Sequence, residues 1–466
     1  MTLPKHLNRA ADYGISRRQL LRTALAGMCG AGASPWFSQL AQAAGSKNTQ
    51  RHCILLWMTG GPSQMDTFDL KPGHENGGEF KEIATSVAGI RFSEHLPQLA
   101  KTAEHLAILR GLVTQEGDHG RGTHLMHTGY APGVGGIRYP TLGSLVSKEL
   151  AAGQAELPNF VSVSPFRLFN NEAHGPGFLG PAFAPLTVVG EAAAAPGLSA
   201  ANILNGTTPT GSRFAELGVN NLRPPESLSD KRALGRLELL NAFETSFAHH
   251  HAMAPAATAH QLVYERAIRL MNSAAGQVFD LSQEPDEVRE RYGAGLFGQG
   301  CLLARRLVER GVPFIEVSLG GPESGSVGWD THIDNFNSVE SLSGELDSGF
   351  ATLIDDLQTR GLLERTTIVW MGEFGRTPAI NDRAGRDHFT DAWSCVLAGG
   401  GIKGGQVHGK TSDDGMSVTD GQVSVGDILA TICQAVGINP EETNRSNIGR
   451  PIKIADGKPI QQILEG

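Results

Sequence analysis

The sequence predicts an α/β protein with a mostly parallel central sheet. From Arg51 onward, short apolar runs of strand length alternate with segments whose apolar residues have helical spacing, which is the pattern of βαβ units. Three of these runs, residues 53–58, 315–319 and 366–371, lead to clusters of charged and polar residues. Because ligands of open α/β sheets bind beyond the carboxyl ends of the strands, the clusters predict a polar site at that edge.

The expected elements follow in order along the chain. After the first strand we expect a helix near residues 96–105, a strand over 106–112, a helix over 141–152 and a strand over 160–164. The alternation resumes with a helix over 295–310, a strand over 314–319, a helix over 341–360, strands over 366–371 and 394–398, and a closing helix over 425–436.

An insertion over residues 165–274 interrupts this order. Residues 165–225 are rich in Gly, Pro, Ala and Asn and have little periodicity, which predicts loops across the mouth of the sheet. Residues 227–251 and 256–274 have helical spacing and predict a helical hairpin. We interpret the histidine run 249–251 as a solvated helix end, because consecutive helical positions point in different directions.

The N-terminus has the pattern of an export signal rather than of an amphipathic helix. Arg17 and Arg18 form a twin-arginine pattern, a mildly apolar stretch follows, and Ala41-Gln42-Ala43 is a small-x-small cleavage site. We expect a signal peptide over residues 1–43, one α/β domain over 44–466, and a periplasmic or secreted protein. No later run reaches the roughly 18 apolar residues of a membrane span, so none is expected.

Composition argues against two further classes of site. The net charge is −9 and no Lys/Arg block occurs after residue 43, which argues against a nucleic-acid partner. Cys53, Cys301, Cys395 and Cys433 form no C-x-x-C pair. We therefore expect buried thiols, with neither a disulfide nor a cysteine metal site.

Two polar clusters supply oxygen and nitrogen donors. Asp330, His332 and Asp334 offer the ligands that hard or borderline divalent cations prefer; alternatively, the carboxylates cap a turn and His332 fills a pocket. In the segment 372–378, Glu373 is a candidate ligand or general base and Arg376 a candidate clamp for an anion. The alternative is a buried ion pair between Glu373 and Arg376.

Three further segments contribute candidates. His388, in Gly-Arg-Asp-His, is a candidate ligand or acid/base group. His119 and Thr123 lie in a glycine-bearing loop that enters a helix, where the positive field of the helix N-terminus suits an anion or a nucleophile; the alternative is an N-cap with helix-facing histidines. The glycine-rich run 399–405 predicts a turn, and His408 beyond it is a weaker candidate.

These motifs together resemble a known family. The twin-arginine leader, Gly-Gly-Pro-Ser-Gln-Met-Asp-Thr-Phe-Asp, His-Gly-Arg-Gly-Thr-His-Leu-Met-His-Thr-Gly-Tyr, Gly-Glu-Phe-Gly-Arg-Thr-Pro and Gly-Arg-Asp-His are similar to the domain of unknown function 1501 family. The resemblance covers essentially the whole mature chain. It implies a sulfatase-like protein of the alkaline phosphatase superfamily, with a three-layer α/β sandwich.

The superfamily motifs carry over only in part. The Asp-x-x-x-His metal motif is similar to residues 330–334, with Asp334 in place of the histidine, and the later Asp-His pair is similar to Glu373-Phe374. Residues 59–61 are Thr-Gly-Gly where the superfamily has a metal-binding aspartate after its first strand. His388 matches the final metal histidine. No cysteine occupies the nucleophile position, so the resemblance leaves Thr123 or His119 for that role.

The resulting hypothesis is a hydrolase of sulfate or phosphate esters, acting on a small-molecule or glycan ester. A divalent metal ion, Zn, Ca or Mg, would be held by the metal ligands Asp330, His332, Glu373 and His388. Arg376 would clamp the anion, and Thr123 or His119 would be the nucleophile. The alternative is a non-catalytic member of the same fold that binds a glycan or a partner.

Overall fold

The computed structural model describes residues 50–151, 156–190, 213–219, single positions between 232 and 271, 274–320 and 327–465. Nine of its strands form one mixed sheet: β1 (His52–Met58), β4 (Leu106–Leu112), β5 (Phe160–Val163), β6 (Leu186–Gly190), β7 (Leu217–Gly218), β8 (Phe314–Leu319), β9 (Thr366–Met371), β12 (Trp393–Gly399) and β13 (Gln406–His408). Their order is β13-β4-β12-β9-β1-β8-β5-β6-β7. The block β9-β1-β8-β5-β6 is parallel, and β12 runs antiparallel to both of its neighbours.

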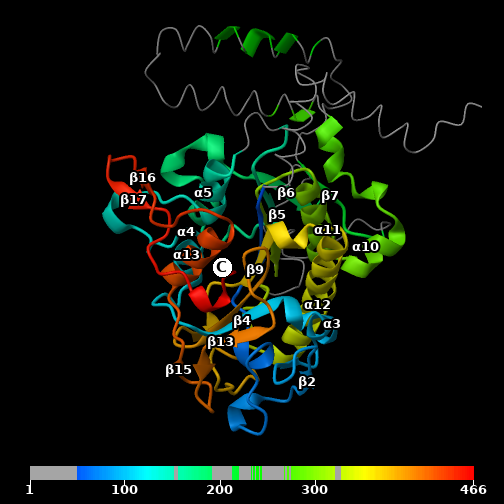
Figure 1. Cartoon of the computed structure of the whole chain (residues 1–466), viewed down its shortest axis with the longest axis vertical. Helices are drawn as coiled ribbons and strands as arrows, with labels where there is room; N and C mark the ends of the chain where they lie inside the picture. Colours follow the sequence, from blue (N-terminus) through cyan, green and yellow to red (C-terminus); the bar gives the residue numbers. More distant parts are fainter. Residues whose placement is uncertain are drawn as a thin grey trace, which may run out of the picture. The chain divides into compact units, whose positions relative to one another are not determined.

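Helices cover both faces of the sheet. One layer contains α3 (Pro97–Lys101), α10 (Asp286–Tyr292), α11 (Leu296–Glu309) and α12 (Asn335–Thr359); the other contains α4 (His119–Thr128), α5 (Leu142–Glu149) and α13 (Val425–Ala435). Figure 1 shows the two layers on opposite sides of the strands. Each layer closes its own apolar core. The predicted three-layer α/β sandwich with a mostly parallel sheet is therefore confirmed.

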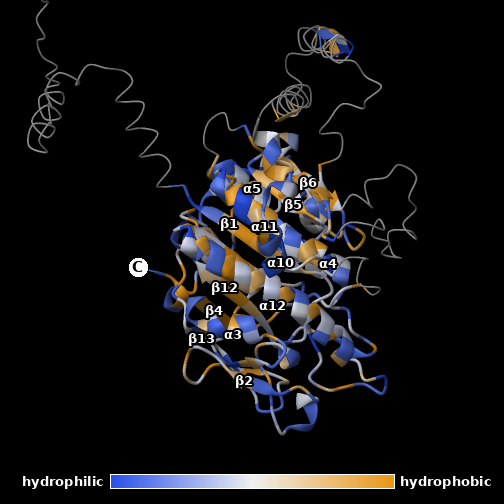
Figure 2. Ribbon diagram, turned by 90° about the vertical axis from the view of Figure 1, so that its right-hand side faces the viewer, coloured by the Kyte–Doolittle hydropathy of each residue, from blue (hydrophilic) through white to orange (hydrophobic). Residues whose placement is uncertain are grey.

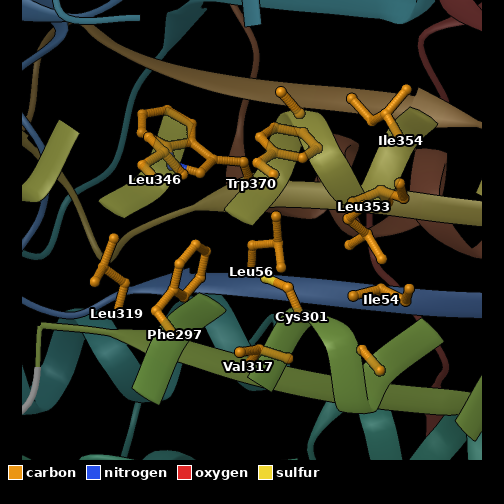
Figure 3. Packing of buried hydrophobic residues seen from close by; sticks show 14 of the residues in the cluster. Ile54, Leu56, Phe297, Cys301, Val317, Leu319, Leu346, Leu353, Ile354 and Trp370 are labelled. Carbon is orange, nitrogen blue, oxygen red and sulfur yellow. The ribbon is translucent and has the colours of Figure 1, made fainter. Parts of the chain in front are cut away.

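The apolar strand runs follow from this two-sided burial. On β1, Ile54 and Leu56 face one core while Leu55 and Trp57 face the other, and all seven residues of the strand are buried. Figure 2 shows the strands and the inner sides of the helices as mainly hydrophobic. In Figure 3, side chains of β1, β8 and β9 interlock with Phe297 and Cys301 of α11 and with α12 residues such as Leu353.

Four small antiparallel pairs lie outside the main sheet. They are β2 (Glu82–Ala84) with β3 (Arg91–Ser93), β10 (Gly375–Arg376) with β11 (His388–Phe389), β14 (Lys410–Thr411) with β15 (Val418–Asp420), and β16 (Thr443–Arg445) with β17 (Pro451–Lys453). The pair β10-β11 sets Arg376 opposite His388 and so joins two of the predicted polar clusters.

The insertion differs from its prediction where it is described. Residues 186–190 were expected to be loop, but they form β6, which pairs in parallel with β5 and extends the sheet. The preceding residues carry short 3-10 turns, including η5 (Glu172–His174). The described positions between 232 and 243 are helical, whereas the histidines at 249–251 and the predicted signal peptide lie outside the described residues.

The four cysteines expected to be buried thiols are all buried and unpaired. Burial raises the pKa of the Cys433 thiol to about 12, which keeps it protonated and unreactive. Within the described part of the chain, no helix is both long enough and apolar enough to cross a bilayer.

Candidate metal centre

The predicted polar clusters meet beyond the carboxyl end of β1. The strand β1 lies between β8 and β9 in the sheet, so the loops that follow these two strands converge above it. The loop after β8 supplies Asp330 and His332, and the hairpin after β9 supplies Arg376 and His388. The helix α4 reaches the same place with its first residue, His119, after the N-cap Asp118, whose side chain accepts a hydrogen bond from the Arg121 amide.

Three imidazoles surround one carboxylate oxygen. The Nε2 atoms of His119, His332 and His388 lie 3.2, 3.1 and 3.3 Å from Oδ1 of Asp330. The Nε2 atoms of His332 and His388 are 3.0 Å apart. Side-chain exposures of 13% for His119, 34% for His332 and 26% for His388 show that the group opens to solvent on the side of the last two.

The other ring nitrogen of each histidine has an acceptor of its own. Nδ1 of His119 lies 2.8 Å from Oε1 of Glu373, and Nδ1 of His332 lies 2.6 Å from Oδ1 of Asp387. Nδ1 of His388 lies 2.7 Å from the carbonyl oxygen of Gly117. With the proton assigned to each Nδ1 by these acceptors, all three Nε2 atoms present lone pairs to a common centre. Metal-binding histidines in proteins are held in this way.

The spacing of the four atoms suits a bound cation. The separations of Asp330 Oδ1 from the three Nε2 atoms, and of the His332 and His388 Nε2 atoms from each other, are 3.0–3.3 Å, close to the roughly 3.3 Å between neighbouring ligands at about 2.0–2.1 Å from one metal ion. The ligand atoms of His119, Asp330 and His388 all lie within 4.8 Å of one another. The Nε2 atom of His119 is buried and makes no hydrogen bond, although Asp330 is near. The donor set, three imidazoles and one carboxylate, is typical of Zn²⁺ and other borderline transition metals rather than of Ca²⁺ or Mg²⁺.

Electrostatics also favours a positive charge at this centre. Burial disfavours the imidazolium form of His119, but the carboxylates of Asp330 and Glu373 outweigh burial and raise the pKa of His119 to about 9. Burial likewise opposes ionisation of Asp330, yet His119, His388 and Arg376 hold its pKa well below the usual range. The Asp330 carboxylate is thus ionised at neutral pH and stabilises a cation, whether a proton or a metal ion supplies the charge.

Glu373 and Arg376 support the centre from inside the protein. Glu373 is fully buried and its Oε1 accepts hydrogen bonds from His119 and from the backbone amide of Gly60, at 2.9 Å. Arg376 is also fully buried and its Nη2 lies 2.7 Å from Oδ1 of Asp330. Its guanidinium also donates to the carbonyl oxygens of Gly60, Gly61 and Arg386. Both side chains therefore orient other members of the group.

The two glycines after β1 explain how the loops come so close. Gly60 and Gly61 have φ values of +101° and +76°. A Cβ on Gly60 would lie 2.4 Å from the amide nitrogen of Asp330, and a Cβ on Gly61 would lie 2.5 Å from the carbonyl oxygen of Phe374. These residues replace the aspartate that the family resemblance would place here. Their peptide groups bind Glu373 and Arg376, so the first loop contributes backbone contacts to the site.

A second buried network fixes the loops that carry the histidines. Asp66 accepts two hydrogen bonds from Arg386, at 2.7 and 3.0 Å, and one from Asn335, at 2.8 Å. Thr331 donates to Asn335 at 2.6 Å. Because Thr331 and Arg386 are sequence neighbours of His332 and Asp387, the network holds the two ligand-bearing loops in register.

Thr123 stands apart from this group. It lies one turn after His119 on α4, is 1% exposed, and its hydroxyl makes no hydrogen bond among the described residues. Among the described residues, no side-chain hydrogen bond joins it to the site histidines. His119 is instead flanked by Phe169, whose ring stacks on the imidazole at 4.3 Å and 7°. The loop after β5 thus covers one side of the centre.

The sequence predicts that most of these residues lie near one another, but it does not reveal their roles. The structure places Asp330, His332 and His388 of the predicted ligand set side by side, together with His119, which was predicted as a nucleophile. Glu373, also predicted as a ligand, contacts Nδ1 of His119 instead. Asp387 was visible beside His388 in the sequence. The carbonyl of Gly117 had no recognisable signal, because its role depends only on where the backbone passes.

Comparison with known proteins gives similarity at low identity. A sulfatase, PsFucS1 from Pseudoalteromonas sp., is 13% identical over 86% of this chain and 70% of its own, with a TM-score of 0.38. The lipoteichoic acid synthase LtaP from Listeria monocytogenes is 9% identical over 88% and 75%, with a TM-score of 0.37. The C-terminal periplasmic domain of EcEptC from Escherichia coli, in complex with Zn, is 11% identical over 90% and 96%, with a TM-score of 0.35.

A search of curated protein sequences found no match to the chain, whereas a family model covers nearly the whole described region. The model described as "Protein of unknown function (DUF1501)" matches residues 50–464, which include every residue of the centre and all nine strands of the main sheet. The chain therefore belongs to the DUF1501 family of proteins of unknown function.

Proposed function

We propose that this chain is a metal-dependent hydrolase of sulfate or phosphate esters, exported by the twin-arginine route to the periplasm or beyond. One observation carries the proposal. Three imidazole Nε2 atoms and one carboxylate oxygen converge, and each imidazole has its other nitrogen bound to an acceptor. The partial exposure of His332 and His388 supports access for a small-molecule or glycan ester from that side.

The residues at the centre would have different roles, which follow from their positions. His119, Asp330, His332 and His388 would hold the metal, which when bound supplies a Lewis acid for ester oxygens and lowers the pKa of bound water. Glu373 holds His119 in the tautomer that presents Nε2, and Arg376 holds the Asp330 oxygen in place. Because the donors of Arg376 are taken by internal acceptors, we assign it the positioning of Asp330 rather than a clamp on the substrate.

Water is the attacking group in this proposal. Of the two side chains considered as nucleophiles, His119 has both ring nitrogens facing carboxylates, and Thr123 is buried. Neither presents a free nucleophilic atom to the open side of the centre. Direct attack by water needs no covalent intermediate on the chain, so Thr123→Val should keep kcat within about threefold of the wild type.

A non-catalytic binding protein is the second candidate, and the state of Arg376 favours it. An ester hydrolase needs positive charge to stabilise the anionic transition state, and the arginine of the centre is sealed in the interior. In a binding protein, the same imidazoles would hold a metal ion or accept hydrogen bonds from a glycan without turnover.

The test combines metal analysis with turnover. The mature protein is supplied with zinc, dialysed and measured by elemental mass spectrometry beside Asp330→Ala, His388→Ala and a matched control, His408→Ala on the edge strand β13. We expect the two site variants to lose about one metal ion per chain and the control to lose none. Hydrolysis of 4-nitrophenyl sulfate or phosphate that disappears with the same metal ion supports the hydrolase. Metal binding without turnover supports the binding protein, and unchanged metal content in Asp330→Ala contradicts metal binding at this centre and with it the hydrolase.

A further inference from the structure

A second group of metal-ligating side chains lies in the interior, away from the candidate centre. It consists of His127 on α4, His174 on η5 and Glu316 in the middle of β8. All three are buried, with exposures of 2%, 2% and 1%. A glutamate in the middle of a buried strand is rare without a charged partner, because removing a carboxylate from water costs several kcal/mol.

The contacts of this carboxylate are too long for direct ion pairs with good hydrogen bonds. Oε1 of Glu316 lies 3.4 Å from Nδ1 of His174, and Oε2 lies 3.7 Å from Nε2 of His127. Among the described residues, the one hydrogen bond that the carboxylate accepts comes from the hydroxyl of Ser162, at 3.3 Å. Distances near 3.6 Å do not satisfy a buried charge.

The ring nitrogens that face Glu316 are also unsatisfied. Nδ1 of His127 lies 2.9 Å from the carbonyl oxygen of Thr123 and must carry the proton there, which leaves Nε2 with a lone pair pointing toward the carboxylate. Nε2 of His127 and both ring nitrogens of His174 are buried and have no hydrogen-bond partner in the part of the chain that the structure describes. Each such unsatisfied buried group destabilises the folded state unless an additional species lies between them.

We propose that this group is a second, structural metal site, at which Zn²⁺ or a similar borderline transition metal binds His127 Nε2, His174 Nδ1 and Glu316. The two carboxylate oxygens each face one histidine, so Glu316 can chelate with both. At metal–ligand lengths of about 2.0–2.2 Å, separations of 3.4 and 3.7 Å correspond to angles of roughly 105–135° at the metal, which a four-coordinate zinc accepts. Imidazole nitrogens favour zinc over calcium or magnesium.

The position of the site indicates a structural role. Its three ligands come from α4, η5 and β8, and the side chains are too deeply buried to meet a substrate. A metal ion there would tie the helix that carries His119 to the strand that leads to Asp330. His119 and His127 lie eight positions apart on α4, about 12 Å along the helix axis, so the two centres are separate.

A proton is the rival occupant of this site. A protonated His127 or His174 paired with Glu316 would neutralise the carboxylate without a metal. Metal content separates the two occupants, because only one of them contains zinc.

The experiment measures zinc in a background that lacks the first centre. Asp330→Ala/His388→Ala protein, supplied with zinc and dialysed, should keep about one metal ion per chain, and its X-ray absorption spectrum should show two imidazoles and a carboxylate with no sulfur ligand. Adding Glu316→Gln or His174→Gln should remove that ion. The matched control is His52→Asn, which removes a buried imidazole that belongs to neither group and whose Nδ1 lies 2.8 Å from the backbone carbonyl oxygen of Val312.

The outcomes do not depend on the proposed hydrolase. Zinc that persists in the double variant and in the His52→Asn control, but not with Glu316→Gln, supports the second site whatever the turnover. A double variant without metal, or one that keeps its metal after Glu316→Gln, overturns the proposal. Should Glu316→Gln not fold, His174→Gln in the same background decides, because it removes one imidazole of the second site and leaves His119 and His332 of the first centre in place.

Discussion

Replacing Asp387 should weaken metal binding at the candidate centre without destabilising the fold. Its carboxylate accepts a hydrogen bond from Nδ1 of His332 at 2.6 Å, and the partner nitrogen Nε2 faces Asp330. Loss of such a partner typically costs 10- to 100-fold in metal affinity. Because the Asp387 side chain is 52% exposed, solvent screens its charge. We therefore expect Asp387→Ala to lower the metal affinity about tenfold, or by ~1.4 kcal/mol.

Two variants separate the charge of Asp387 from its hydrogen bond. Asp387→Asn keeps a hydrogen-bond acceptor for His332 but removes the charge, so its metal affinity should fall only about threefold below that of the wild type. This difference in affinity should shrink at high salt. Affinity is measured by competition with a chromophoric chelator, with Asp382→Ala in the same exposed loop as the control. Urea unfolding of the metal-free proteins should agree within about 0.5 kcal/mol. Wild-type affinity in Asp387→Ala would refute the assignment of His332 as a ligand held by this carboxylate.

Three further predictions concern stability. Asp66→Ala leaves the guanidinium of Arg386 buried without its carboxylate and should lower the free energy of unfolding in urea by about 3–5 kcal/mol, of which Asp66→Ala/Arg386→Met should recover a part. Burial lowers the pKa of His52 to about 4, so the folded state binds this proton less tightly than the unfolded state, and the stability is present above about pH 6.5 and lost as the pH falls toward 4. His52→Asn should therefore reduce the loss of stability between pH 7 and pH 4.5 by about 2–3 kcal/mol, measured by thermal unfolding across that range; parallel curves for both proteins would contradict this. Gly60→Ala should cost about 1–3 kcal/mol more than Gly73→Ala, since both glycines have positive φ but only the first would set a Cβ 2.4 Å from a backbone nitrogen of the loop after β8.

The main strands could be predicted because burial on both faces makes them continuous apolar runs. The bounds expected for β4, β8 and β9 match those observed, and β1 differs by one residue. The start of α12 could not be found in this way. It begins at Asn335 rather than at the predicted residue 341, because Asn335 is held by Asp66 and Thr331 across the interior. A tertiary contact, not local propensity, sets this helix end.

The sequence predicts where the candidate centre lies better than it predicts what each residue does there. Polar clusters after β8 and β9 must converge because these strands flank β1, and this reasoning brings Asp330, His332 and His388 together. The position of Glu373 depends on partners 254 and 313 residues away, His119 and Gly60, which no local pattern reveals. The group of His127, His174 and Glu316 has one recognisable signal in the sequence, the single charged residue Glu316 in the apolar strand β8.

The wide separation of the ligands along the chain has a consequence for biogenesis. The first histidine of the centre is residue 119 and the last is residue 388, and the strands that place them are interleaved in the sheet. Contacts of such long sequence separation form late in folding, because the closure of long loops must come first. A ribosome-bound fragment that ends before β11 has no complete centre. A metal ion bound at the proposed centre would therefore be acquired only after residue 388 has been made, and its occupancy would report how much of a preparation has reached the native topology.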